Sequence, residues 1–277
     1  MQRFNFLDIK FIIGAALVGT VLFVAAFGYM LTPHTPERQN LMFALEPPLS
    51  AGYLLGTDHL GRDIFARMVS GARVSLAIAA SVVLISGIIG VLVGAISGYF
   101  GGLRDVVMQK IVETFWAFPP ILLAIAILAF FGQSLTNIIF ALAVQRWIPY
   151  ARIARAQSLV LRSREFVEAS QVMGGGLVWV MRRHILPNLA ASAIIIATFS
   201  MATAILAEAS LSFLGLGVPP RIATWGGMLS EGRSYLTRAW WLAVFPGLGI
   251  FITVLGLNLL GDWLRDQFDP KKTLNLV

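Results

Sequence analysis

The sequence contains no cysteine and few charged residues, and both absences narrow the classes of protein to which it can belong. Without cysteine the chain has no disulfide bond and no thiolate metal site, and the redox compartment is left open. Charged residues make up 13% of the 277 residues, whereas a soluble domain carries about 25%. Hydrophobic residues make up 57%, and the mean hydropathy is +0.79. This composition is typical of a protein that crosses a membrane several times.

The sequence also lacks the motifs of common catalytic sites. It has no G-x-x-x-x-G-K-[ST] phosphate-binding loop, so the chain does not form a P-loop ATPase by itself. It has no H-E-x-x-H motif, no recognisable nucleophile–base arrangement and only 3 histidines. We therefore expect that the chain is not an enzyme and binds neither a cofactor nor a metal.

Six hydrophobic segments are long enough to cross about 30 Å of hydrocarbon. They lie at residues 11–31, 76–98, 109–131, 136–157, 190–212 and 241–262. The first segment is longer than the apolar core of about 7–15 residues in a secretory signal, and no small-residue cleavage site clearly follows it, so an uncleaved helix is expected. The sequence therefore predicts an all-α membrane protein with six transmembrane helices.

The basic residues predict the orientation of these helices. With the N-terminus in the cytoplasm, about two thirds of the 21 Lys and Arg residues fall on the inner side. We therefore expect both termini and the loop 158–189 to face the cytoplasm. The net charge of +7 does not indicate nucleic-acid binding, because the positive charges are scattered among hydrophobic segments and form no single basic face.

The loop 158–189 is polar and glycine-containing in an otherwise hydrophobic chain. Glu165 and Glu168 are three residues apart, which places them on one face of a short helix. Gly174 and the two glycines after it disfavour an uninterrupted helix, at roughly 1 kcal/mol per glycine relative to alanine. Pro187 marks the start of the next buried helix. These residues by themselves leave two interpretations open, an ordinary solvated loop and a docking site for a partner.

The interval 32–75 is the longest segment outside the predicted spans. Its first half contains four prolines and is expected to be irregular. In its second half Asp63 and Arg67 are four residues apart and accompany an apolar stripe of Ile64, Phe65, Met68 and Val69, which predicts a helix on the outer membrane surface. Asp58, His59 and Asp63 are also conceivable metal ligands, but capping and ion pairing explain the acids better.

Two unusual features fall inside the predicted spans. Pro119 and Pro120 interrupt the span 109–131, and the carbonyl groups that they free need partners on neighbouring helices. Broken helices often line the substrate path of transporters, although a packing kink explains the prolines equally well. Glu208 lies in the span 190–212, where an acidic side chain is costly. Either a place in a translocation path or a hydrogen bond or salt bridge to another helix would explain it.

Small and basic residues mark the inner ends of two other spans. Gly94, Gly98, Gly101 and Gly102 present small surfaces that allow another helix to approach closely. Three arginines of the span 136–157 are expected to reach lipid headgroups or to pair with the loop 158–189; they are Arg146, Arg152 and Arg155.

The loop 158–189 resembles the EAA loop of permease subunits in binding-protein-dependent ABC importers. That motif reads E-A-A-x3-G-x9-I-x-L-P. Here Glu168-Ala169-Ser170 is followed by Gly174 and then by His184-Ile185-Leu186-Pro187. Ser170 stands in place of the second alanine and His184 in place of the isoleucine. In this family the loop forms a coupling helix that sits in a cleft of the cytoplasmic ATPase.

The resemblance implies roles for individual residues of this loop. Glu165 and Glu168 would contact the ATPase, with Ala169 and Ser170 in the same motif. Gly174 would allow the turn, and Leu186-Pro187 would fix the return into the next span.

A second resemblance lies before the predicted span 76–98. The residues from Gly56 to Asp63 resemble the G-T-D-x-x-G-R-D signature of the C-type permease of dipeptide, oligopeptide and nickel importers. Further similar stretches bring the covered part to about residues 50–272. The resemblance implies a type I ABC importer permease fold with both termini inside. Its parts would be a first helix and outer loop at 1–75, a core domain at 76–272 and a cytoplasmic tail at 273–277.

The same resemblance implies partners and a substrate class. Such a subunit forms half of a translocation pathway in the bacterial inner membrane, together with a homologous B-type permease. Two cytoplasmic ATPases bind ATP and magnesium, and an extracytoplasmic solute-binding protein delivers the solute. Peptides are the expected substrates, with nickel, glutathione or another small solute as alternatives. An ion-driven secondary transporter that uses Glu208 is a rival function, disfavoured by the small number of spans and the long polar inner loop.

Overall fold

The computed structural model describes residues 7–268, and this part of the chain contains helices and no strand. The helices are α1 (Ile9–Phe27), α2 (Ile64–Phe100), α3 (Gly102–Trp116), α4 (Pro120–Phe131), α5 (Leu135–Leu161), α6 (Glu165–Val172), α7 (Leu177–Val180), α8 (Leu186–Phe213), α9 (Trp225–Gly232) and α10 (Trp241–Phe268). Short 3-10 turns lie at Gly28–Leu31, Leu41–Phe43 and Arg233–Tyr235, and a π turn at Met181–Ile185. The all-α prediction is confirmed; the predicted tail at 273–277 lies outside the described residues.

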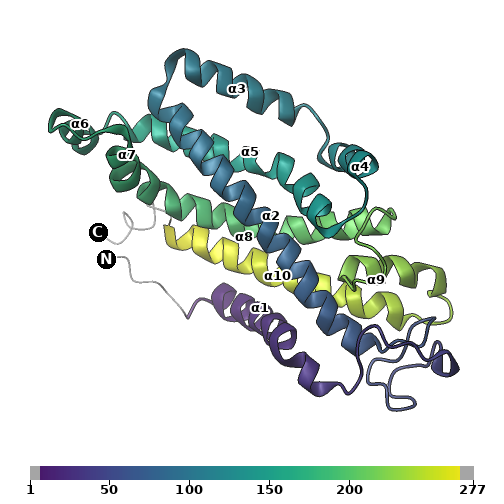
Figure 1. The fold of residues 1–277 in the computed structure, drawn as a ribbon. Helices are drawn as coiled ribbons and strands as arrows, with labels where there is room; N and C mark the ends of the chain where they lie inside the picture. The colour runs from purple at the N-terminus through teal and green to yellow at the C-terminus, as the bar shows by residue number, and fades with distance from the viewer. Residues whose placement is uncertain (1–6, 269–277) are drawn as a thin grey trace.

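The long helices α2, α5, α8 and α10 form an elongated bundle (Figure 1). α2 packs against α5 and α8, while α1 covers α10. The beginning of α1, the end of α10 and the pair α6–α7 lie at the same end of the bundle, and α9 lies at the other end (Figure 1). This arrangement agrees with the predicted orientation, in which the loop 158–189 and both termini share one side of the membrane. That this side of the membrane is the cytoplasmic one stays a prediction.

Four helical stretches are long and apolar enough to cross a membrane, namely Ile9–Leu31, Ile64–Phe100, Leu177–Phe213 and Trp241–Phe268. The pair α3–α4 makes a fifth if it counts as one broken crossing, because its two halves meet at a bend of 82°. The helix α5 has 27 residues but carries three arginines, so it is less apolar than these. A multi-spanning helical protein is therefore confirmed, and the number of six crossings stays a prediction.

The predicted helix on the outer membrane surface is wrong. α2 begins at Ile64 and continues without interruption to Phe100, through the whole of the predicted span 76–98. Ile64 and Val69 are 2% and 3% exposed, so they pack inside the protein and not against lipid. An apolar stripe has the same spacing on a helix that lies on a membrane surface and on a helix that packs inside a protein, so the sequence pattern does not distinguish the two. Asp63 does not pair with Arg67 but caps α2, accepting a backbone N–H of its first turn at 2.9 Å.

A row of glycines brings α2 and α5 into close contact, as predicted for Gly94 and Gly98, whereas a Cβ at Gly102 would meet no atom within 4 Å. A Cβ added at Gly90, Gly94 or Gly98 would overlap backbone carbonyl oxygens of α5. The absence of side chains at these positions lets the two backbones touch, which favours dispersion contacts between helices in a membrane. The row ends where Gly101, with φ of +62°, turns the chain into α3.

An ion pair fixes α3 against α5 beside this row. Arg155 donates from Nε to Oδ1 of Asp105 and from Nη2 to Oδ2, both at 2.6 Å, and Ser97 donates from Oγ to the same carboxylate at 2.5 Å. The expectation that Arg155 reaches headgroups or the loop 158–189 is therefore wrong. Its partner comes from α3, because α3 folds back along α5 after the turn at Gly101 (Figure 1).

Candidate functional site

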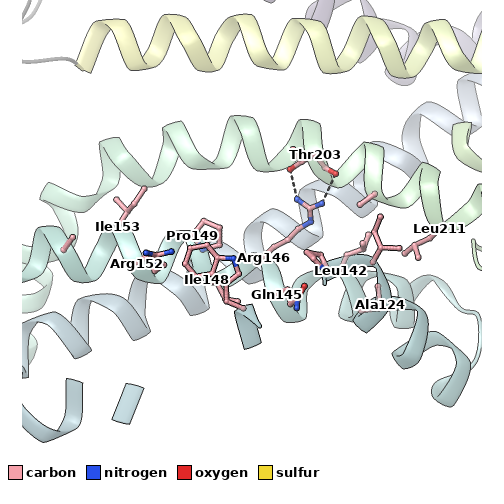
Figure 2. Close-up of a pocket in the computed structure, with 16 residues that line it drawn as sticks. Ala124, Leu142, Gln145, Arg146, Ile148, Pro149, Arg152, Ile153, Thr203 and Leu211 are labelled. Carbon is pink, nitrogen blue, oxygen red and sulfur yellow. Dashed lines mark hydrogen bonds between the residues drawn. The ribbon is translucent and has the colours of Figure 1, made fainter. Parts of the chain in front are cut away.

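A cavity of about 730 Å³ lies between α4, α5 and α8 (Figure 2). Most of its lining is apolar, and its polar side chains are Gln145, Arg146, Arg152 and Thr203. The volume falls within the range of roughly 300–1,000 Å³ that small-molecule sites occupy. Among the described residues that line it, none is acidic.

The break between α3 and α4 forms one wall of this cavity and is held by α5. Gln145 of α5 donates its side-chain amide to the carbonyl oxygens of Phe115 at 2.9 Å and Phe118 at 2.8 Å. These bonds supply the partners that the proline pair was predicted to require. Pro120 lines the cavity, whereas Pro119 lies at the bend and is not among the lining residues.

Arg152 reinforces the same wall through an aromatic contact. Its guanidinium carbon lies 3.8 Å from the centre of the Trp116 ring. A guanidinium over an indole face is attracted by the ring quadrupole. Arg152 is therefore engaged with the end of α3, and no contact with the loop 158–189 is seen for it among the described residues.

Arg146 lies near the middle of α5 and extends toward α8 (Figure 2). It donates from Nη1 to Oγ1 of Thr203 at 2.6 Å and from Nη2 to the carbonyl oxygen of Thr203 at 2.8 Å. No acidic side chain within residues 7–268 forms an ion pair with it. The expectation that Arg146 reaches headgroups or the loop 158–189 is therefore wrong, and a charge this far inside a span already signals a functional position.

Glu208 lies on α8 outside the lining of the cavity. It is 1% exposed, and its Oε1 accepts a hydrogen bond from Ser212 Oγ at 2.8 Å. A Cβ added at Gly226 of α9 would lie 3.1 Å from Oε2. Glu208 is therefore a buried group packed against α9, with its hydrogen bond made inside α8, and the predicted bond to another helix stays a prediction. Its role in a pathway stays a prediction.

We call residues 165–187 the coupling segment. It projects from one end of the bundle as α6, α7 and the π turn that leads into α8 (Figure 1). Glu165, Glu168 and Ala169 are exposed on α6, whereas Val167 and Ser170 are 0% and 5% exposed. The helix therefore has one face fixed to the protein and one face free.

Glycine makes the turn after α6, as the sequence predicted. Gly174 has φ of +86°, a conformation that glycine adopts without steric cost. The N–H of Gly175 then donates to the carbonyl oxygen of Ser170 at 2.9 Å, which closes the end of the helix. Val172 and Met173 are left 89% and 82% exposed at the tip.

A small core ties the coupling segment to the long helices. The residues buried together in this core are Val167 of α6, Val180 of α7, Ile185 of the π turn, Leu189 of α8, Ala95 of α2 and Ala154 of α5. Leu186 packs against this core, and Pro187 stands in the first turn of α8. These contacts join α6 directly to α2, α5 and α8.

A charged cluster at the other end of the bundle joins the loop before α2 to α9. Arg62 donates to Asp58 at 2.5 Å and to Glu231 at 2.8 Å, and Arg67 donates to Glu231 at 2.9 Å. Asp58, His59 and Glu231 lie close enough together to hold a metal ion. Both acids, however, already bind guanidinium groups, so the donor set favours a structural ion-pair network. Asp63 is directed elsewhere, toward Thr32 at 2.9 Å.

Comparison with known proteins connects these features to a family. The sequence matches the binding-protein-dependent transport system inner membrane component over residues 90–274. It is 41% identical to a putative peptide transport system permease protein of Brucella suis over 95% of this chain and 88% of that one. It is 40% identical to the oligopeptide transport system permease protein of Bacillus subtilis over 94% of this chain and 85% of that one.

A solved structure has the same fold. The inward-facing MetNI methionine ABC transporter aligns with a TM-score of 0.58 and 20% identity, covering 73% of this chain and 97% of that chain. The likeness supports the permease fold expected from the sequence. Together with the apolar helices, the family match places the protein in the bacterial inner membrane as a multi-pass component. The chain belongs to the family of binding-protein-dependent transport system inner membrane components, the permease subunits of ABC importers.

Proposed function

We propose that this chain is the C-type permease subunit of an ATP-driven peptide importer and forms half of its translocation pathway. Relatives named as peptide, oligopeptide and di/tripeptide permeases, which align with more than nine tenths of the chain, support peptides as the substrate class. A relative named as a glutathione transport permease keeps glutathione and similar short peptides within this class. Nickel or another small solute is the alternative.

The proposal requires partners that carry out the steps for which this chain has no residues. A homologous B-type permease supplies the other half of the pathway, and a solute-binding protein delivers the peptide from outside. Two cytoplasmic ATPases bind ATP and magnesium and perform the hydrolysis. This chain has no phosphate-binding loop, and we expect it to bind no cofactor of its own.

The single observation that carries the proposal is the two-sided coupling segment. Its inner face is buried in a core shared with α2, α5 and α8, and its tip exposes Val172 and Met173. Large apolar side chains that are this exposed at the end of a membrane protein favour a protein partner. The exposed Glu165 and Glu168 add charge to the same surface. We infer that the ATPase docks here.

Docking at this site explains how ATP hydrolysis moves the bundle. When the two ATPases close around ATP, they displace α6, and the shared core passes this displacement to the long helices. Helices that are packed this closely move as rigid bodies, so the pathway opens on one side and closes on the other. The peptide is thereby exposed alternately to the outside and the inside.

A glycine pair offers a matched test of coupling. Gly174 and Gly132 both have positive φ, +86° and +84°, and a Cβ at either position would meet no atom within 4 Å. Asp therefore imposes the same kind of backbone strain at both sites. We expect Gly174→Asp to reduce ATP-driven peptide uptake roughly tenfold or more, equivalent to about 1.4 kcal/mol of coupling, while ATP hydrolysis and membrane insertion persist. Gly132→Asp, at the end of α4, should keep uptake coupled.

The measurement is uptake and ATPase activity of the complex reconstituted in vesicles, normalised to the amount of this chain in the membrane. Undiminished uptake by Gly174→Asp would contradict the docking role of the coupling segment. A complex purified through a tag on this chain that contains no ATPase would contradict the proposed function as a whole.

A further inference from the structure

We propose that the cavity between α4, α5 and α8 binds the carboxylate of the transported peptide, and that Arg146 is the residue that recognises it. The inference rests on the proposed function, since it names a contact that the peptide makes during passage. It assigns the recognition of one chemical group to this chain in addition to the selection made by a binding protein.

The described lining of the cavity is positively charged. It contains two guanidinium groups, those of Arg146 and Arg152, and no carboxylate. A cation near the middle of a membrane helix is costly, by at least about 2.5 kcal/mol on insertion scales, and is normally paired. Arg146 donates to the hydroxyl and the carbonyl oxygen of Thr203, and no acid among the described residues pairs with it. An anionic group of the solute would complete this pairing.

Thr203 does not use all of the N–H donors of Arg146. An arginine side chain has five N–H donors, and Thr203 accepts from two nitrogens of Arg146. Further N–H groups are left for a ligand. Because Thr203 holds the guanidinium in place, less conformational entropy is lost when a ligand binds.

The other donors of the cavity are held against the broken helix instead. The amide N–H groups of Gln145 are donated to the broken helix, and Arg152 lies over Trp116. Arg146 is therefore the group best placed to bind a carboxylate, while the apolar lining can accept side chains of varied shape. Such a site recognises the terminal group that peptides share and tolerates differences in sequence.

The same helix shows what an arginine looks like when its role is structural. Arg155 binds Asp105 through two parallel hydrogen bonds of 2.6 Å. This fork-to-carboxylate geometry is the one that a peptide C-terminus would offer to Arg146. The rival interpretation is that Arg146 only ties α5 to α8 through Thr203.

The experiment compares a free carboxylate with its amide. The complex is purified through a tag on this chain, without binding protein, and placed in lipid nanodiscs. The probe is trialanine with a benzophenone on its N-terminus, and the competitors are trialanine and trialanine amide. Crosslinks to α5 and α8 are mapped by mass spectrometry. In the wild type we expect trialanine to block labelling at a concentration roughly tenfold lower than the amide, a preference of about 1.4 kcal/mol.

Three variants separate the two interpretations. Arg146→Gln should make acid and amide equal competitors, and Arg146→Lys should keep a weaker preference because it retains the charge without the fork. Arg238→Gln is the control, since Arg238 is exposed and lies outside the cavity lining, and it should leave the preference unchanged. A purely structural Arg146 would lower the melting temperature when mutated but leave the acid preference in the folded protein.

Two results would overturn the proposal, namely equal competition by acid and amide in the wild type, or a full acid preference in Arg146→Gln. If Arg146→Gln is not recovered in the membrane, the wild-type comparison and Arg146→Lys still decide between carboxylate recognition and a purely structural role of Arg146. A failure here is distinguishable from a failure of the proposed function. In the first case the ATPase co-purifies and Gly174→Asp uncouples uptake although the cavity shows no preference; in the second no ATPase co-purifies.

Discussion

The two sides of α5 differ in how completely their polar groups are satisfied. The side toward α2 and α3 is closely packed, with glycines against backbone oxygens and Arg155 bound to Asp105. The side toward α4 and α8 borders a cavity, and its Arg146 has no acidic partner among residues 7–268. Arg155 and Arg146 both belong to α5, but only Arg155 is paired with an acid of the described chain. The difference teaches that a charge neutralised within the chain belongs to the structure, whereas a charge left without a counterion is available for a ligand.

The first way to test this comparison is to remove the acid on the packed side. Asp105→Asn leaves Arg155 without a counterion, and we expect a loss of about 2–3 kcal/mol in the free energy of unfolding, because the pair is largely but not fully buried. Glu113→Gln on the same helix is the matched control. Its partner Lys110 is 75% exposed, and such surface pairs contribute at most about 1 kcal/mol.

Unfolding by titration with SDS in mixed micelles would measure both changes. Equal losses for Asp105→Asn and Glu113→Gln would show that the pair on the packed side is not structural.

The second test adds a methyl group to the packed side. Gly94→Ala would force a Cβ against the carbonyl oxygen of Ala151, and overpacking of this kind costs about 1–3 kcal/mol. Gly19→Ala, on an exposed stretch of α1 where a Cβ meets no atom within 4 Å, is expected to have the opposite sign. It should gain up to about 1 kcal/mol from helix propensity. The same titration applies, and a stabilising Gly94→Ala would refute the close approach of α2 and α5.

The smallest stability effect is expected on the cavity side. Gln145→Leu removes two hydrogen bonds to the break between α3 and α4, at about 1 kcal/mol each. It also removes the buried Oε1, which has no hydrogen-bond partner within the described structure, and this gain offsets part of the loss. We expect a net change of about 1 kcal/mol. A loss larger than that of Asp105→Asn would mean that the cavity side is as structural as the packed side.

Local features of this protein were predictable from the sequence. Gly94 and Gly98 were assigned to close packing, and the structure places them against α5. Gly174 was assigned to a turn, and its φ of +86° provides one. The proline pair was expected to break a helix whose carbonyl groups need partners, and Gln145 supplies them. In each case a few neighbouring residues decide the conformation, because steric and hydrogen-bonding limits act on the local backbone.

Sequence patterns were less informative about which surface a helix buries. The stripe on Ile64 and Val69 predicted contact with lipid, and the tertiary structure covers it with protein. Arg155 was expected near headgroups and instead binds Asp105, 50 residues away. An apolar or basic side chain specifies the chemistry of its surroundings but not whether lipid or another helix provides them.

The sequence by itself determined that this protein is a bundle of membrane helices with a glycine-broken coupling segment, because periodicity, glycine and proline act over a few residues. Only the tertiary structure decided that Arg62 and Arg67 meet Glu231 from 169 and 164 positions away, and that Arg146 faces a cavity beside Thr203. The physical reason is that pairing between distant residues depends on how the helices pack against one another, and many packings satisfy the same local pattern.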